Sequence, residues 1–215
     1  MADGKLADAN FAHIPARAIR AMIADCLAAA GLPGDDAGRC AELMTEADLT
    51  GADGHGIFRL AQYVRRLKAK GFNARPNITV SRTAPATALV DGDNGMGHLV
   101  MTRATNEAIA MARENGVAWV GVRRSNHAGP AGLYAEMAAV AGMVGVYAAV
   151  ANANHMATWG GTELLMPIHL WHIAIGIAFF ITKDGGAPDA DLGLDCLIIH
   201  TAPMPLCSVR TDHAV

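Results

Sequence analysis

Apolar residues recur at intervals of three and four in three segments of the N-terminal third of the chain. Residues 15–30 carry the first stripe, and residues 57–70 carry the third. The second stripe begins after the Pro33–Gly34 pair, where Asp35 or Asp36 is the expected N-cap. This periodicity predicts three amphipathic helices that pack together as a small helical unit.

The pattern changes after about residue 73, where short runs typical of strands alternate with runs of helical spacing. The predicted strands are residues 77–82, 86–90, 117–123, 144–150 and 173–177. The predicted helices among them are residues 99–115 and 133–141. Strands that alternate with helices in this way are typical of a layered α/β domain.

These patterns divide the chain into three parts. Residues 1–72 form the expected helical unit, and residues 73–177 form an α/β domain. Residues 178–215 read as a divergent tail, because apolar triplets such as 197–199 and isolated prolines show no sustained period there. No order of elements is predicted for this tail.

The composition is that of a globular protein, with 215 residues of which 52% are apolar and 17% charged. A net charge of -3 and the absence of a basic stripe argue against nucleic-acid binding. The longest apolar runs, 140–151 and 173–181, are shorter than a membrane span requires. Residues 1–12 lack a signal-peptide pattern and the four cysteines form no close pair, so we expect a soluble cytoplasmic protein.

A histidine stands in a loop of small residues between a predicted strand and a predicted helix. Ser125, Asn126 and His127 open this loop, which continues through Gly129 to Gly132. Catalytic side chains concentrate on loops that a rigid scaffold carries, and histidine is suited to proton transfer near neutral pH. The alternative is that Ser125 or Asn126 caps the following helix and that His127 only packs.

His55 and Arg59 form a second candidate group. They stand four residues apart, so they share one face if a helix begins near His55. That face combines a proton-transfer group with a planar cation, which suits a substrate that carries a carboxylate beside a reacting carbonyl. The alternative is a helix start that carries an exposed arginine.

Residues 152–161 form a third group, which follows a predicted strand and ends in the pair Gly160–Gly161, where backbone amides can approach a ligand closely. The glycine pattern of a Rossmann site is absent from the chain, and so is a P-loop. His155, His169 and His172 could suggest a metal site. We expect none, because no carboxylate or further ligand stands at a recognisable spacing.

Taken together, these segments resemble the malate/L-lactate dehydrogenase-like family of NAD(P)-dependent oxidoreductases, which does not use the Rossmann fold. The resemblance runs over about residues 13–177 and rests on residues 46–60, 75–77, 91–95, 125–127, 151–156 and 159–161. It implies a fold in which a helical unit precedes a mixed-sheet α/β domain. It also implies a cytoplasmic homodimer that transfers a hydride between NAD or NADP and a small 2-hydroxy or 2-oxo acid, such as malate, lactate or ureidoglycolate, or a cyclic imino acid.

The resemblance also implies roles for individual residues. By position, His127 looks like the family's proton donor and acceptor, and His55 like its substrate-site histidine. Arg59 looks like the carboxylate-binding arginine, and Asn126 is expected beside the substrate. The residues expected to contact the cofactor are Asn154, His155, Trp159, Gly160 and Gly161.

The chain departs from the family pattern in two places. Gly54 stands where the family has serine before its first histidine. After Gly161 the family's Gly-Thr-Asn-Pro-like loop and long C-terminal part have no counterpart, so the end reads as truncated or frame-shifted. We therefore expect the nicotinamide cofactor to bind weakly or not at all. The alternative to an enzyme is therefore a non-catalytic remnant or interaction subunit of the same fold.

Overall fold

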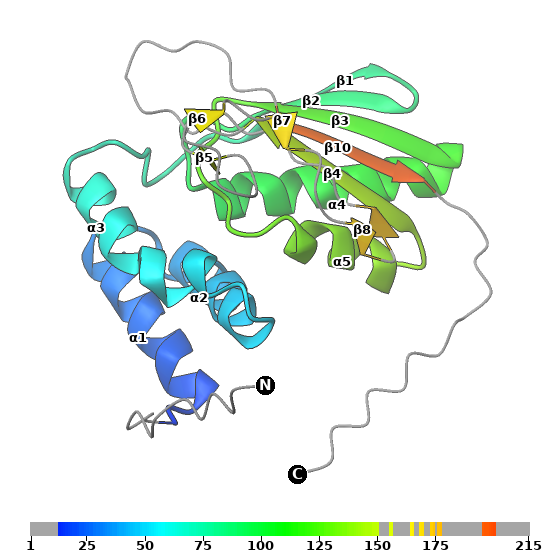
Figure 1. Cartoon of the computed structure of the whole chain (residues 1–215). Helices are drawn as coiled ribbons and strands as arrows, with labels where there is room; N and C mark the ends of the chain where they lie inside the picture. Colours follow the sequence, from blue (N-terminus) through cyan, green and yellow to red (C-terminus); the bar gives the residue numbers. More distant parts are fainter. Residues whose placement is uncertain are drawn as a thin grey trace, which may run out of the picture.

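The computed structural model describes residues 13–150 without a break. Beyond them it describes the backbone of short strands at 155–156, 164–165, 168–169, 173–174, 176–177 and 195–200. Figure 1 shows a helical unit and, beside it, a sheet with two helices packed on one of its faces. The expected fold class, helices followed by a mixed-sheet α/β domain, is confirmed.

The helical unit contains α1 (Ala16–Ala29), α2 (Gly34–Leu49) and α3 (Leu60–Lys68). Its core combines residues of the three predicted helices with Leu32, Phe72 and Met96, which lie outside them. The residues from the helices are Ile23, Leu27, Ala37, Cys40, Ala41, Met44, Tyr63 and Leu67. One detail of the expectation is wrong, because Pro33 is the N-cap of α2 and no side chain caps it. Asp35 and Asp36 lie in the first turn instead, where their charges favour the helix dipole.

The segment expected as one helix over residues 57–70 begins differently. Two 3-10 turns, η1 (Asp53–His55) and η2 (Ile57–Arg59), precede α3. The break lies at Gly56, whose backbone (φ -89°, ψ -132°) is outside the helical region. The carboxylate of Asp48 packs against this glycine and accepts a hydrogen bond from the backbone N–H of Ile57 at 2.9 Å. His55 and Arg59 therefore do not share one face of an α-helix, and that expectation is wrong.

The main sheet has the strand order β1-β2-β3-β10-β4-β7. Its strands are β1 (Thr79–Ala84), β2 (Thr87–Asp91), β3 (Val117–Arg123), β4 (Val144–Val150), β7 (Ile168–His169) and β10 (Asp195–His200). β2 runs parallel to β3, whereas β1 is antiparallel to β2. The sheet is therefore mixed, and β10 runs antiparallel to both of its neighbours, β3 and β4.

Two helices, α4 (Gly97–Asn115) and α5 (Gly132–Val140), cover one face of this sheet (Figure 1). Alternate residues of β3 point toward them, so Ala118, Val120 and Val122 are buried. On the opposite face of β3, Trp119 is half exposed. The helices therefore bury the core of the α/β part on one side of the sheet only, within the residues that the structure describes.

Two findings concern the C-terminal segments. The run expected as one strand over residues 173–177 forms two short strands, β8 (Ile173–Ala174) and β9 (Gly176–Ile177), which pair with each other. β10 belongs to the segment for which no element order was predicted, yet it lies between β3 and β4. Two further short strands, β5 (His155–Met156) and β6 (Leu164–Leu165), also pair with each other.

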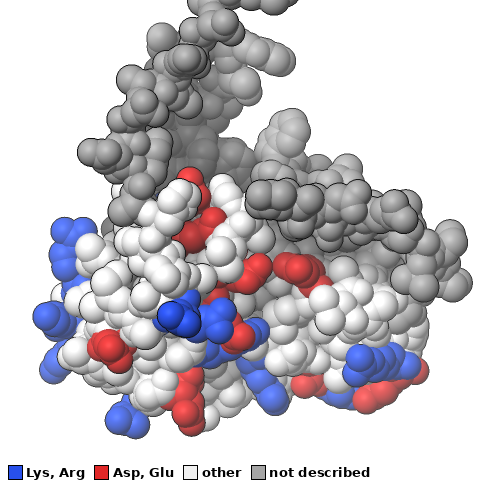
Figure 2. All heavy atoms as spheres, turned by 90° about the horizontal axis from the view of Figure 1, so that it is seen from below, with Lys and Arg blue, Asp and Glu red and all other residues white. Residues whose placement is uncertain are grey.

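The helical unit lies at the end of the sheet where β2 and β3 finish (Figure 1). Arg39 of α2 reaches the sulfur of Met137 on α5, and Met96, just before α4, belongs to the core of the helical unit. On the face shown in Figure 2, positive and negative side chains are interspersed. Among the described helices none is both long and apolar enough to cross a membrane.

Candidate functional site

The candidate site forms where the parallel strands β2 and β3 end side by side. Asp91 closes β2 and lies opposite Arg123, the last residue of β3. The two loops that follow stay joined, because Gly92 N–H donates to the carbonyl of Arg123 at 2.9 Å and Asn94 N–H donates to that of Arg124 at 2.8 Å. The carboxyl ends of neighbouring parallel strands are a preferred place for ligand sites.

Charges strengthen this junction. Asp91 accepts from Arg123 Nε at 3.1 Å and pairs with Arg124 at 2.7 Å. Partial burial raises the pKa of Asp91, but the hydrogen bonds from Arg124 and from the backbone of Asp93, with the two arginine charges, outweigh it and hold the pKa below 3.8. Asp93, Asn94 and Arg124 have positive φ angles, so this ionic network stabilises an unusual backbone.

Asn126 fixes the loop formed by residues 124–131. Its side-chain N–H groups donate to Asn94 Oδ1 and to the carbonyl of Gly95, both at 2.9 Å. Its Oδ1 accepts from Arg66 of α3 at 3.0 Å. The amide of Asn126 therefore ties the 124–131 loop to the loop after β2 and to the helical unit.

A glycine allows this loop to lie directly on α4. A Cβ atom at Gly97, the first residue of α4, would lie 2.0 Å from the carbonyl oxygen of Asn126 and 2.5 Å from that of His127. Both obstacles are backbone atoms, which a side-chain rotation cannot move. Gly97 thus permits the close contact that positions the backbone of His127 against the start of α4.

His127 lies among aromatic and imidazole rings. Its Nδ1 is 2.6 Å from the hydroxyl of Tyr63, which comes from α3. The backbone N–H of Gly129 donates to the same nitrogen at 3.3 Å. His55 stacks on His127 with ring centroids 5.4 Å apart and planes 18° apart. The two histidines expected at the site are therefore brought together.

Arg59 makes other contacts. Its Nε donates to the carbonyl of Gly54 at 2.8 Å, and its Nη1 donates to Gln62 Oε1 at 3.0 Å. Both bonds are exposed to solvent, where a ligand carboxylate can replace them. Arg66, one turn beyond Tyr63 on α3, contacts the 124–131 loop at Asn126, and its guanidinium carbon lies 4.3 Å from the centre of the Phe72 ring.

A third histidine, His98, was not singled out in the sequence. It is fully buried in the first turn of α4, and its ring meets that of Tyr63 edge to face at 5.6 Å. Burial, followed by the nearby His127, His55 and Arg39, lowers the pKa of His98 to about 3, so its ring is neutral. Within the described residues neither of its ring nitrogens has a hydrogen-bond partner.

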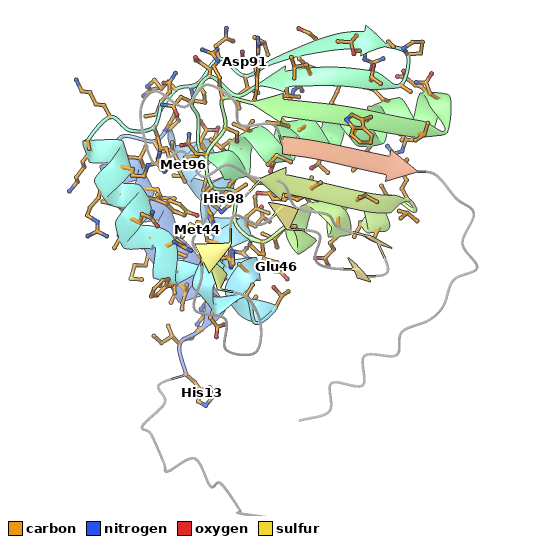
Figure 3. All side chains as sticks on the ribbon, turned by 45° about the horizontal axis from the view of Figure 1, so that its top comes forward. His13, Met44, Glu46, Asp91, Met96 and His98 are labelled. Carbon is orange, nitrogen blue, oxygen red and sulfur yellow. The ribbon has the colours of Figure 1, made fainter. Side chains whose placement is uncertain are left out.

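Figure 3 shows His98 with Met96 and Met44 where the helical unit meets α4. His98 could have been identified as a candidate only from its place beside Gly97 at the start of a helix. The predicted helix began at residue 99, one residue too late to include it. The sequence did place Tyr63 on the inward face of its helix, which is correct, since the residue is 1% exposed. Its bond to a loop more than sixty residues away could not be read from that face.

The helix-capping alternative for Ser125 and Asn126 is wrong, because α5 begins at Gly132 with Ala131 as its N-cap and no capping side chain. The side chains of the expected cofactor residues lie outside the described residues: Asn154, His155, Trp159, Gly160 and Gly161. In the described part of the chain no group of three or more His, Cys, Asp or Glu side chains could hold a metal ion.

A helical unit joined to a mixed α/β sheet is also the fold of solved dehydrogenases to which this chain is similar. The family model of malate/L-lactate dehydrogenase matches residues 14–174, and the chain belongs to that family. The resemblance noted from the sequence is thereby confirmed.

Individual relatives agree with this assignment. The malate dehydrogenase of Pyrococcus abyssi is 39% identical over 160 residues, which cover 74% of this chain and 44% of that protein. The L-sulfolactate dehydrogenase of Methanocaldococcus jannaschii is 39% identical over 146 residues, or 67% of this chain and 42% of that protein. The structure of malate dehydrogenase from Pyrococcus horikoshii OT3 matches with a TM-score of 0.67 and 38% identity, over 74% of this chain and 45% of the other. The chain thus spans less than half the length of these relatives.

Proposed function

We propose that this protein is an oxidoreductase that transfers a hydride between NAD or NADP and a small 2-hydroxy or 2-oxo acid of the malate or lactate type. The observation that carries the proposal is His127, a proton-transfer group held by Tyr63 and Gly129 and stacked on His55 at the carboxyl ends of parallel strands. Relatives named malate, sulfolactate and lactate dehydrogenases support it over a non-catalytic interaction subunit.

The described side chains suit one half of this reaction. Imidazole, phenol and guanidinium groups move protons and bind carboxylates, but none of them carries a hydride. A nicotinamide cofactor supplies the hydride when it is bound. Its expected contacts are Asn154, His155, Trp159, Gly160 and Gly161, as the family resemblance implies.

In this proposal His127 gives a proton to the substrate oxygen during reduction and takes it back during oxidation. His55, whose ring stacks on that of His127, is the substrate-site histidine that the family resemblance implies. Arg59 exchanges its exposed bonds to Gly54 and Gln62 for the substrate carboxylate. Asn126 keeps the loop in place and lies beside the substrate. We further propose a homodimer located in the cytoplasm, as the family resemblance implies.

The proposal is tested by replacing His127 with glutamine. Oxidation of NADH and NADPH is followed with the 2-oxo acids that correspond to malate and lactate. Loss of a general acid lowers turnover by about 10²–10⁴-fold, and we expect an effect of that order with little change in melting temperature. His13→Gln is the matched control, since His13 lies at the exposed start of the described chain (Figure 3).

Equal turnover of His127→Gln and the parent protein would remove His127 from the mechanism. Calorimetric titration with NADH and NADPH reports cofactor binding separately from turnover. A folded parent protein that neither binds a cofactor nor reduces any of these acids would favour the interaction subunit instead.

A further inference from the structure

We propose that Tyr63 is a positioning residue which holds neutral His127 in a single tautomer, with the proton on Nε2 and the lone pair on Nδ1. The inference rests on the proposed function for its catalytic meaning, but the tautomer itself is a property of the unliganded protein. Two groups that can donate a hydrogen bond, the amide of Gly129 and the hydroxyl of Tyr63, converge on Nδ1 of His127.

The first donor is the backbone of Gly129. An amide N–H can only donate, so its 3.3 Å contact with His127 Nδ1 requires a lone pair on that nitrogen. Gly129 has φ +81°, and a Cβ atom there would lie 3.1 Å from Nε2 of His98. Glycine therefore allows the 124–131 loop to turn its amide toward the imidazole ring.

The second donor is Tyr63. A phenol can donate or accept, but the lone pair already assigned to Nδ1 makes Tyr63 the donor at 2.6 Å. A neutral imidazole carries one proton, so that proton lies on Nε2. The hydroxyl of Tyr63 is much closer to Nδ1 than the amide of Gly129 is, which makes it the principal determinant of the tautomer.

Tyr63 is itself firmly held. Its side chain is 1% exposed, and its ring packs against His98 at 5.6 Å and Phe72 at 6.1 Å between centroids. Because His98 is neutral, it brings no charge against the phenol. One turn further along α3, Arg66 binds Asn126, the residue next to His127. Two side chains of α3 therefore hydrogen-bond two consecutive residues of the loop, Asn126 and His127.

The consequence concerns the substrate. A neutral His127 with its proton on Nε2 can donate a hydrogen bond to the 2-oxo oxygen, which accepts but cannot donate. When His127 is an imidazolium, both ring nitrogens carry protons, and the Gly129 amide no longer has an acceptor. The Tyr63 hydroxyl can rotate and accept from Nδ1–H, so it is a partner for both protonation states. Proton transfer in reduction then runs from Nε2 of the imidazolium to the substrate oxygen, which leaves the proton on Nδ1 and a lone pair on Nε2. In oxidation that lone pair takes the proton back.

The test is Tyr63→Phe, which removes the hydroxyl and keeps the ring that packs on His98 and Phe72. Imidazole nitrogen chemical shifts, measured by NMR, distinguish a protonated from an unprotonated ring nitrogen, and His127→Gln identifies the His127 signals. We expect the parent protein to show unprotonated Nδ1. In the variant we expect the ratio of the two tautomers to fall by about threefold to tenfold, as the loss of one hydrogen bond predicts.

Tyr134→Phe is the matched control. Tyr134 is also a buried tyrosine that binds the 124–131 loop, but its hydroxyl donates to the carbonyl of Ala128 and not to the imidazole. We expect its loss to leave the His127 tautomer unchanged. In turnover, Tyr63→Phe should lower kcat by a similar threefold to tenfold and leave the KM for the 2-oxo acid nearly unchanged.

An unchanged His127 tautomer in Tyr63→Phe would overturn the proposal, and so would an equal change in Tyr134→Phe. A parent protein with protonated Nδ1 would overturn it as well. If the parent protein turns over no substrate, the proposed function fails, yet the NMR measurement still decides the role of Tyr63.

Discussion

Asp48 and Gly56 meet so closely that the carboxylate of one fills the place of a β-carbon on the other. A Cβ atom at Gly56 would lie 1.8 Å from Asp48 Oδ1. The same carboxylate holds the backbone N–H of Ile57 at 2.9 Å. The contact lies at the junction of η1 and η2, directly after His55, the residue whose ring stacks on His127.

Gly56→Ala should therefore displace Asp48 and break its bond to Ile57. We expect a loss of about 1–3 kcal/mol in the free energy of unfolding, since a part-buried acceptor loses its partner. Chemical denaturation measures it. Gly54→Ala is the control two residues away, where a Cβ atom meets nothing within 4 Å. Equal losses in both variants would show that the Asp48 contact does not matter.

Gly97 and Gly132 offer a second matched pair, because each is the first residue of a helix, α4 and α5 respectively. A Cβ atom at Gly97 meets the backbone oxygens of Asn126 and His127, whereas one at Gly132 meets nothing within 4 Å.

We expect Gly97→Ala to cost about 1–3 kcal/mol of stability, as overpacking of a tight contact does, and to lower turnover by shifting His127. Gly132→Ala should be nearly neutral in both measurements. The explanation fails if Gly97→Ala melts at the same temperature as the parent protein.

The buried His98 predicts a pH dependence of stability. In the folded protein its pKa is about 3, whereas an unfolded histidine titrates near 6.5. The unfolded chain therefore binds a proton first as the pH falls, so the stability held above pH 6.5 is lost progressively toward pH 3. The loss is on the order of a few kcal/mol.

His98→Phe removes this titration and leaves a ring against Tyr63. We expect its free energy of unfolding to depend less steeply on pH between about 3 and 6.5 than that of the parent protein. His13→Phe, at an exposed position, should retain the steeper dependence. The measurement is denaturant unfolding at a series of pH values, and parallel curves for parent and His98→Phe would contradict the burial of a neutral imidazole.

Most of the local structure follows from the sequence. Apolar periodicity predicted every helix of the described part to within a few residues, except at the start of α3. The strand over residues 117–123 was predicted with its observed bounds. These predictions succeed because neighbouring residues along the chain determine helical and extended periodicity.

The site was predicted in part for the same reason. The small residues around His127 indicated a loop that carries a proton-transfer group, and His55 was expected as a second such group at a helix start. The structure stacks the two rings. The assumed helix from His55 to Arg59 failed because the backbone of Gly56 is not helical, where Asp48 from the preceding helix packs against it and accepts from the N–H of Ile57. A hydrogen bond across nine residues is invisible to a pattern of apolar spacing.

The sequence alone therefore determined the helical unit, the α/β alternation and the loop that carries His127. Only the tertiary structure decided that β10 enters the sheet between β3 and β4, and that Tyr63 and His98 surround the catalytic candidate. The physical reason is the range of the interactions. Periodicity and turn chemistry act within a few residues, whereas strand pairing and the Tyr63–His127 bond join segments that are distant in the chain and adjacent in space.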